Sequence, residues 1–374
     1  MPGGFILEVK DGKVLESIRA FLKNLLERKL LEALLVPMAF PGNNKIAISL
    51  VSDPAMLTCA DPLAPIMPVN TARVVSGMTR VAPGERTVGV VLRSCELRAL
   101  IELAKLKQAS LDNLVLIGID CFGTYPVASY DEFCQKSPAP TEEFLKARGS
   151  PDALLREACR ICEHPTPVNA DLSLGLIGMD LEQSVMVQAL SPKGEQILKP
   201  LGLRENTAAE VKRREEALAK YMSGLTGAKG ELFNRYRKEL VGPENLLSVF
   251  ASCTGCHNCR IACPLCYCRE CFFDSPTFAW EADKYLGWAE KKGALRMPTD
   301  TLLYHLTRLN HMVVSCVGCG MCQEACPNNI PVFRVFRLVG ATVQDNFQYI
   351  PGRSLADELP LNVFREDELN EVGQ

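Results

Sequence analysis

Two short stretches of the sequence determine how its last third folds. Residues 253–264 read CTGCHNCRIACP, and residues 316–327 read CVGCGMCQEACP. Both match the pattern C-x2-C-x2-C-x3-C-P, in which three thiolates come from one tight loop and a fourth follows at the next turn. Zinc sites also use C-x2-C pairs, but a zinc ion needs only four ligands, and these two repeats ending in Cys-Pro exceed that requirement. The two stretches therefore predict two [4Fe–4S] clusters.

The fourth cysteine of each stretch decides which thiols share a cluster. In two-cluster ferredoxins it binds the cluster of the other stretch. We therefore predict a crossed arrangement with two sites. The first site takes Cys253, Cys256, Cys259 and Cys326, and the second site takes Cys316, Cys319, Cys322 and Cys263.

Three more cysteines follow the first stretch directly, at Cys266, Cys268 and Cys271. Their C-x-C-x2-C spacing has no single meaning, and it leaves open a zinc ion, an additional cluster or thiols buried as packing residues. A helix is expected at residues 301–313, between the two stretches. We interpret His305 and His311 in this helix as ordinary helix residues, because the two clusters already have eight cysteines.

Composition excludes several classes of protein. The chain has 374 residues, a net charge of −3 and no polybasic run, so it lacks the charge pattern of a nucleic-acid binder. No apolar stretch reaches the roughly 18 residues that a membrane span needs. The first residues do not resemble an export signal, so we expect a cytoplasmic protein. In that reducing setting, 17 cysteines indicate metal binding rather than a disulfide framework.

The amino-terminal half alternates helical and strand patterns. Apolar spacing predicts an amphipathic helix at residues 14–31 and strands at 45–51, 87–92 and 113–119. A helix capped by Ser94 is expected at residues 94–107. Strand, helix and strand at this length predict a right-handed unit with parallel strands. No G-x-G-x-x-G or P-loop motif accompanies it.

Four further cysteines are candidates for a third [4Fe–4S] cluster. Cys95 and Cys121 each follow one of the two paired strands, and the carboxyl ends of parallel strands meet at one crevice. Cys159 and Cys162 form a C-x2-C pair that could supply the remaining two thiolates. The alternative is that Cys95 and Cys121 are buried small hydrophobic residues, a common role for free cysteine.

These patterns predict three parts. Residues 1–200 form an α/β (or α+β) domain, residues 201–248 form a helical linker that includes a charged helix at 207–220, and residues 249–374 form a mostly helical ferredoxin-like domain with the two clusters.

Several segments resemble one known family along nearly the whole chain. Residues 91–105 (VLRSCELRALIELAK), 117–121 (IGIDC), 263–268 (CPLCYC) and 349–352 (YIPG) are similar to the flavin-binding β subunit of coenzyme F420-linked hydrogenases and formate dehydrogenases. The formate dehydrogenase branch fits best. The family also has cysteines at the positions that match Cys95, Cys121, Cys159 and Cys162. Residues 122–125 (FGTY) depart from it, because the family often has glycines there.

The resemblance implies an oxidoreductase subunit with FAD in its α/β domain. A separate catalytic subunit of a formate dehydrogenase or hydrogenase would supply electrons, which pass through the clusters to FAD and on to F420, to NAD or to a heterodisulfide reductase-type partner. Two functions follow. One is a flavoenzyme subunit that exchanges electrons with a diffusible cofactor, and the other is a module that passes electrons only between proteins.

Overall fold

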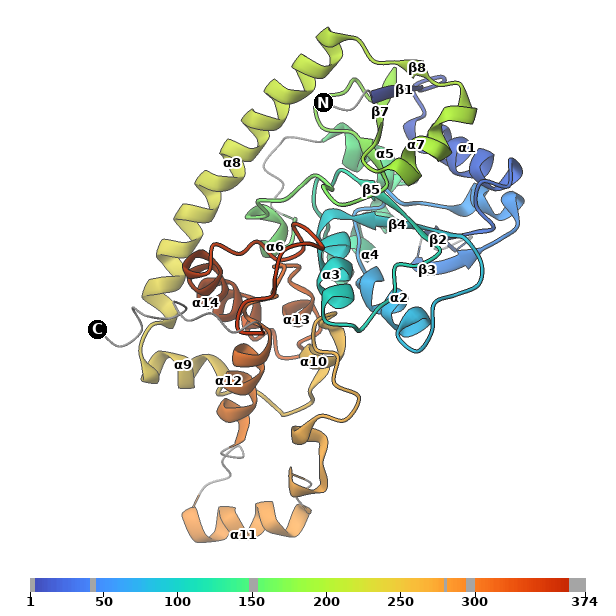
Figure 1. Ribbon diagram of the computed structural model, residues 1–374. Coiled ribbons are helices and arrows are strands. Elements are labelled where there is room, and N and C mark those ends of the chain that lie inside the picture. The colour runs from blue at the N-terminus through green and yellow to red at the C-terminus, as the bar shows by residue number, and fades with distance from the viewer. Residues whose placement is uncertain (1–3, 41–44, 148–153, 279–280, 294–299, 363–374) are drawn as a thin grey trace.

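The computed structural model describes residues 4–40, 45–147, 154–278, 281–293 and 300–362. A mixed α/β part and a helical part lie end to end in Figure 1, and the long helix α8 (Ala208–Leu240) runs along one side of both. This arrangement confirms the expected α/β region followed by a mostly helical region. None of the helices within the described ranges is long and apolar enough to cross a membrane.

The α/β part is built on a single sheet, which has eight strands in the described residues. Its order is β3-β2-β4-β5-β6-β7-β1-β8, and the central strands β2, β4, β5 and β6 are parallel. The strands are β1 (Gly4–Glu8), β2 (Ala33–Ala39), β3 (Ile46–Val51), β4 (Val88–Arg93), β5 (Leu114–Ile119), β6 (Leu172–Gly175), β7 (Ser184–Ala189) and β8 (Arg204–Glu205).

Helices surround this sheet and form the second part of the molecule. Those of the α/β part are α1 (Val14–Glu27), η1 (Pro54–Cys59), α2 (Thr71–Thr79), α3 (Ser94–Lys105), α4 (Val127–Lys136), α5 (Pro140–Lys146), α6 (Glu157–Arg160), α7 (Pro192–Leu198) and η2 (Lys199–Leu201). After α8 come α9 (Pro243–Phe250), α10 (Asn258–Ala262), η3 (Phe272–Asp274), η4 (Pro276–Phe278), α11 (Ala282–Lys292), α12 (Asp300–Met312), α13 (Met321–Glu324) and α14 (Val332–Asn346).

The predicted strand–helix–strand unit is present, since β4 and β5 pair in parallel with α3 between them. Two predicted boundaries are wrong. Helix α1 ends at Glu27 because Lys29 has a left-handed φ of 55°, and the next two amides turn back to the Leu25 carbonyl. Helix α3 is capped at Arg93 and not at Ser94, because the buried Glu96 carboxylate accepts the Arg93 N–H at 3.0 Å.

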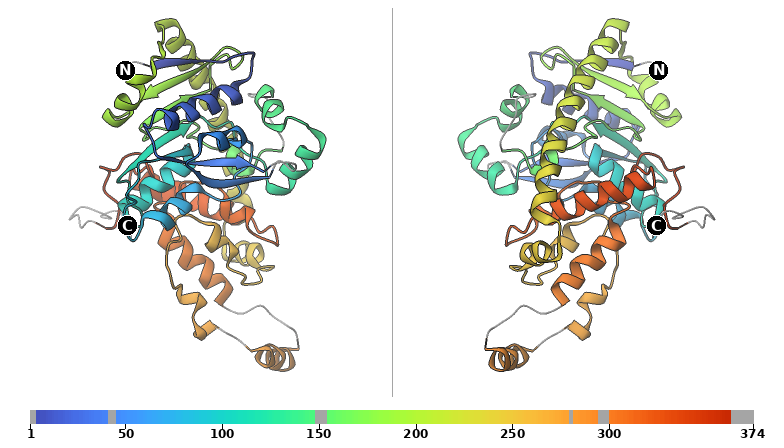
Figure 2. Two further views of the ribbon diagram at one scale, coloured as in Figure 1. Left: turned by 90° about the vertical axis from the view of Figure 1, so that its right-hand side faces the viewer. Right: turned by 90° about the vertical axis from the view of Figure 1, so that its left-hand side faces the viewer.

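The two faces of the sheet bury different partners. On one face, α1 packs Ile18 and Leu22 against strands of the sheet. On the other face, Leu97 and Leu100 of α3 belong to the same hydrophobic core as Phe333 of α14. Helix α3 therefore lies between the sheet and the helical part, so one continuous core joins the two parts (Figure 2).

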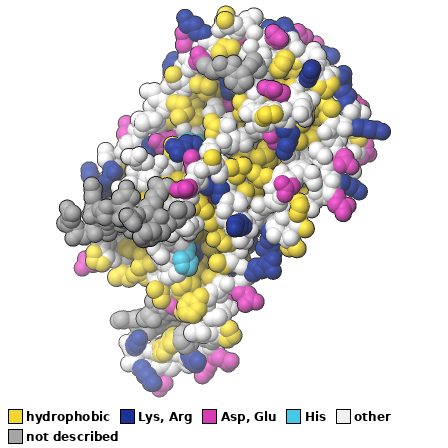
Figure 3. Space-filling view, viewed as in Figure 1, with side chains coloured by type: hydrophobic (Ala, Val, Ile, Leu, Met, Phe, Trp, Pro, Cys, Tyr) yellow, Lys and Arg dark blue, Asp and Glu magenta, His cyan; other side chains and the backbone are white. Residues whose placement is uncertain are grey.

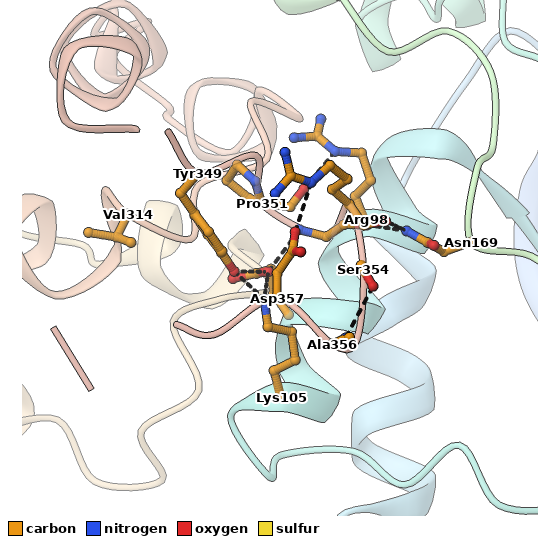
Figure 4. Close-up of polar contacts among 12 residues, drawn as sticks. Arg98, Lys105, Asn169, Val314, Tyr349, Pro351, Ser354, Ala356 and Asp357 are labelled. Carbon is orange, nitrogen blue, oxygen red and sulfur yellow. Dashed lines mark hydrogen bonds and ion pairs between the residues drawn. The ribbon is translucent and has the colours of Figure 1, made fainter. Parts of the chain in front are cut away.

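The segment of residues 349–357, which we call the C-terminal strap, crosses α3 on its outer side (Figure 4). The buried Glu102 carboxylate accepts hydrogen bonds from the Tyr349 hydroxyl at 2.5 Å and from the Gly352 N–H at 2.8 Å. Arg98 donates to the Pro351 carbonyl at 2.8 Å. Gly352 has a φ of +70°, and a Cβ there would lie 2.3 Å from the Arg98 carbonyl oxygen. Only glycine lets the two backbones approach this closely.

The surface mixes acidic and basic side chains. On the described part of the face in Figure 3, charges of both signs are interspersed, and hydrophobic side chains gather across the middle. This pattern fits the net charge of −3 of the whole chain.

Candidate iron–sulfur sites

The third group of predicted cysteines comes together at the carboxyl edge of the sheet. Cys95 lies in the first turn of α3 after β4, Cys121 follows β5, and α6 and the residues just after it carry Cys159 and Cys162. All four line one partly open cavity of about 480 Å³. The structure therefore brings these four thiols together from three separate segments. We call this group of four thiols the third site.

Local backbone geometry makes this convergence possible. Gly123 has a φ of +106°, and a Cβ on it would lie 2.8 Å from the Leu155 side chain and 3.1 Å from the Cys159 Cβ. The glycine thus allows the loop after β5 to approach α6. The Gly123 N–H donates to the Cys121 sulfur at 3.4 Å, and the Thr124 hydroxyl lies 3.5 Å from the Cys159 sulfur.

The four cysteines assigned to the first site lie together in the structure. Cys253, Cys256, Cys259 and Cys326 line one cavity of about 320 Å³ in the helical part. Cys253 and Cys259 are buried, whereas Cys256 is exposed. The Ile330 N–H donates to the Cys326 sulfur at 3.4 Å. One thiol of the second stretch thus joins three of the first stretch.

The four thiols of the second site are neighbours where α10 packs against α13. Burial raises the pKa of the Cys322 thiol well above its usual value, and the adjacent Cys263, Cys319 and Cys316 raise it further. Burial also raises the pKa of Cys263, and the negative charge of Cys319 is the next largest cause. The second site therefore also contains one thiol from the other stretch.

These thiols lie in surroundings that penalise a free thiolate. Burial raises the pKa of Cys121 to about 12 and that of Cys319 to about 11. The thiolate is the metal ligand, so its charge needs compensation by a bound cation.

Among the described residues, no group of three or more His, Cys, Asp or Glu is placed to hold a single metal ion. A zinc site would need four ligands about 2.0–2.3 Å from one ion, whereas a cubane cluster occupies a larger space between its cysteines.

The second and third sites are in direct contact. Cys319 of the second site also lines the cavity of the third site. The neighbouring Gly320 has a φ of +74°, and a Cβ on it would lie 2.5 Å from the Cβ of Ala158 in α6. The loop of the second stretch therefore packs against the helix that carries Cys159.

Sequence reasoning missed several residues beside the first site. His305 was expected to be an ordinary helix residue, but its Nε2 lies 3.4 Å from the Cys253 sulfur and its ring stacks on Phe250. The buried Arg308 donates to the Cys259 sulfur at 3.1 Å. No spacing rule identifies these residues, because a single His or Arg in an amphipathic helix has no repeat that links it to the cysteines. His311, by contrast, is exposed.

The three cysteines of residues 266–271 have unlike surroundings. Cys266 lies near the second site and Arg308, and Cys268 is exposed. Cys271 packs against a small hydrophobic group formed by Cys259, Phe273 and Tyr304. These differences do not favour one shared ion, and a metal at this segment stays a prediction.

Residues 122–125, which depart from the family pattern, are packed with aromatic rings at the carboxyl edge of the sheet. Phe122 meets Tyr221 of α8 edge to face at 6.2 Å between ring centroids. Tyr125 is buried and meets Phe133 and Phe144 in the same manner, each at 5.4 Å. Of these rings, Tyr221 of α8 lines the cavity of the third site.

Comparison with known proteins identifies relatives. Residues 249–330 match the family described as 4Fe-4S dicluster domain. The F420-dependent formate dehydrogenase subunit beta of Methanocaldococcus jannaschii is 25% identical, with 90% of this chain and 91% of the relative covered. The F420-dependent formate dehydrogenase 1 subunit beta of Methanococcus maripaludis is 27% identical, with 73% and 74% covered. The chain is a homologue of these formate dehydrogenase β subunits.

Among solved structures, a chain from the F420-reducing [NiFe] hydrogenase complex of Methanosarcina barkeri superposes with a TM-score of 0.47 and 13% identity. The match covers 65% of this chain and 94% of that one.

Proposed function

We propose that this chain is the electron-transferring β subunit of an F420-dependent formate dehydrogenase. In this function it passes electrons between three [4Fe–4S] clusters and FAD, and so to or from F420. The observation that carries the proposal is the third site, where four cysteines from three segments line one cavity that also reaches Cys319 of the second site.

The three sites form a series. Cys256 of the first site is exposed, so this site is the one open to a protein partner that oxidises formate. Arg308 lies between the first and second sites, and the Gly320–Ala158 contact joins the second to the third. The third site ends the series at the carboxyl edge of β4 and β5, where open parallel sheets usually bind ligands.

The chain's own residues fit iron–sulfur clusters. The thiols provide four ligands at each site, and burial limits access of water to Cys253, Cys259 and Cys263. The unpartnered Nε atoms of the buried Arg156 and Arg308 also fit, because a cluster bound by four thiolates supplies the negative charge that these cations need.

FAD binding is proposed for the α/β domain, residues 1–200, without covalent attachment. When bound, a flavin converts the single electrons of clusters into the hydride that F420 or NAD carries. The relatives named F420-dependent support F420 as the acceptor. We propose the crevice beside the third site as the flavin position, since electrons would leave the series there.

Metal and flavin analysis of the anaerobically purified chain tests this function. We expect about twelve irons and equal sulfide, because three clusters hold four irons each. Acid should release FAD with its characteristic absorption spectrum, and the chain should catalyse F420-dependent dye reduction. Cys159→Ala should lose roughly four irons. Cys59→Ala is the matched control, since this half-buried free thiol lies outside the three sites.

Two results would contradict parts of the proposal. An unchanged iron count in Cys159→Ala would exclude the third cluster. A chain replete with clusters but free of flavin, and inactive with F420 and NAD, would instead indicate a module that passes electrons only between proteins, such as a heterodisulfide reductase-type partner.

A further inference from the structure

Two buried arginines lie between the cysteine sites. Arg308 of α12 is 3% exposed, and Arg156, which directly precedes α6, is 4% exposed. In the part of the chain that the structure describes, neither guanidinium forms an ion pair with a carboxylate, and the Nε of each has no hydrogen-bond partner. A buried cation without a counter-ion is costly, so each needs negative charge nearby.

Arg308 faces the first and the second site at once. Its Nη1 donates to the Cys259 sulfur and its Nη2 to the Cys259 carbonyl oxygen, both at 3.1 Å. Arg308 also lies close enough to Cys263 and Cys322 of the second site for its charge to act on both sulfurs. The rings of Tyr304 and Phe336, centred 5.5 and 5.1 Å from the guanidinium carbon, help to fix its position.

Arg156 has the same relation to the second and third sites. It lines the cavity of the third site, and its Nη2 donates to the Cys159 sulfur at 3.7 Å. Its Nη1 donates to the Met321 sulfur at 3.3 Å, and Met321 stands between Cys319 and Cys322 in the sequence. Cys319 of the second site lines the same cavity as Arg156.

A cation in such a position changes the redox equilibrium of a cluster. Reduction adds one negative charge, so a fixed positive charge stabilises the reduced form more than the oxidised form. The effect is largest where the surroundings have a low dielectric constant. Net charge and hydrogen bonds to sulfur are among the factors that set cluster potentials.

We propose that Arg308 and Arg156 set the reduction potentials along the series, each raising the potentials of the two clusters that it lies between. Arg308 acts on the first and second clusters, and Arg156 acts on the second and third. The proposal rests on the clusters of the proposed function.

A third buried arginine, Arg98, has different hydrogen-bond partners from Arg308 and Arg156. Arg98 lies near Cys162 and Cys95, but its hydrogen bonds go to the carbonyl oxygens of Pro351 and Val317 rather than to sulfur. These bonds tie α3 to the strap and to the loop of the second stretch. We therefore assign Arg98 a structural role.

Redox titration of the full chain, followed by electron paramagnetic resonance, tests the proposal. Arg308→Gln should shift the midpoint potentials of the first and second clusters to more negative values and leave the third unchanged. Arg156→Gln should shift the second and third and leave the first unchanged. Arg204→Gln is the matched control, because Arg204 forms an exposed ion pair with Glu210 at β8, the edge strand of the sheet, and it should shift none.

Iron analysis of each variant separates tuning from folding. Unchanged potentials in iron-replete Gln variants would overturn the proposal. If a Gln variant loses iron, the matching Lys variant decides, since it keeps the charge but lacks the forked hydrogen bonds. Because lysine keeps the positive charge, an iron-replete Lys variant with potentials close to the wild-type values would support the proposal. Large shifts or iron loss in the Lys variant would show that the forked hydrogen bonds, and not the charge, are what matters, and would overturn it. Absence of clusters from the wild-type chain would refute the proposed function itself.

Discussion

Asp120 and Arg214 form a buried ion pair that joins the sheet to α8. Asp120 follows β5, and its Oδ2 accepts a hydrogen bond from Arg214 Nη1 at 2.6 Å across 94 positions of sequence. The same oxygen accepts the backbone N–H groups of Leu176 and Ile177 after β6, at 2.8 and 2.9 Å. The pair therefore fixes three segments beside the third site.

Asp120→Asn should destabilise the chain by about 3–5 kcal/mol, because it leaves the Arg214 charge buried without its partner. Anaerobic denaturant unfolding, followed by circular dichroism, measures the change. Glu216→Gln removes a carboxylate from the exposed pair with Lys212, and it should cost only about 0–1 kcal/mol. Equal losses in the two variants would contradict the role of the buried pair.

Crossed ligation predicts which variants share a phenotype. Cys263→Ser should abolish the same paramagnetic signal as Cys319→Ser, although Cys263 belongs to the other stretch. Cys326→Ser should likewise match Cys256→Ser, because these two thiols line the same cavity. If Cys263→Ser matched Cys256→Ser instead, each stretch would bind its own cluster.

Gly320→Ala should disturb the contact between the second and third sites. The added Cβ would lie 2.5 Å from the Ala158 Cβ, and the φ of +74° disfavours any side chain. We expect lower stability and weaker magnetic interaction between these two clusters. Adding Ala158→Gly removes the clashing atom and should restore part of the interaction.

Gly224→Ala is the control for this change. Gly224 lies on the exposed face of α8 with open space around it, so alanine should stabilise the helix by roughly 0.5–1 kcal/mol. No recovery in the double variant would show that backbone strain, and not the clash, causes the defect.

The buried carboxyl group of Asp61 should make the stability of the folded chain depend on pH. Burial raises the pKa of its carboxyl group to about 6, although the Thr141 hydroxyl donates to it at 2.6 Å. The pKa of Asp61 is higher in the folded state than in the unfolded state. The ionised carboxylate therefore destabilises the folded state, and this destabilisation is absent below about pH 4 and complete above about pH 6. Asp61→Asn should therefore stabilise the chain by up to about 3 kcal/mol at pH 7.5.

The advantage of Asp61→Asn should shrink as the pH falls toward 4.5. Thermal unfolding of the wild-type chain and the variant at both pH values measures this difference. Asp283→Asn, on the exposed face of α11, should show no such dependence. An Asp61→Asn variant with the same advantage at both pH values would rule out the titration of Asp61 as its cause.

The sequence predicted those features that repeat or alternate. The valine-rich runs predicted the parallel pair of β4 and β5, and the four cysteines that the spacing assigns to the first site line one cavity. Convergence of Cys159 and Cys162 with Cys95 and Cys121 could be proposed, but spacing alone could not establish it, because it depends on how α6 packs against the sheet. Arg156 and Arg308 were not predicted, since each is a single charge whose burial depends on tertiary packing.

The C-terminal strap affects how this protein is made. Glu102 of α3 bonds to Tyr349 and Gly352, about 250 positions later in the chain. A ribosome must therefore add about 250 residues after Glu102 before α3 receives its outer cover. Until then the Glu102 carboxylate lacks the hydrogen bonds from Tyr349 and Gly352, and a product truncated before Tyr349 would leave this side of α3 open to solvent and proteases.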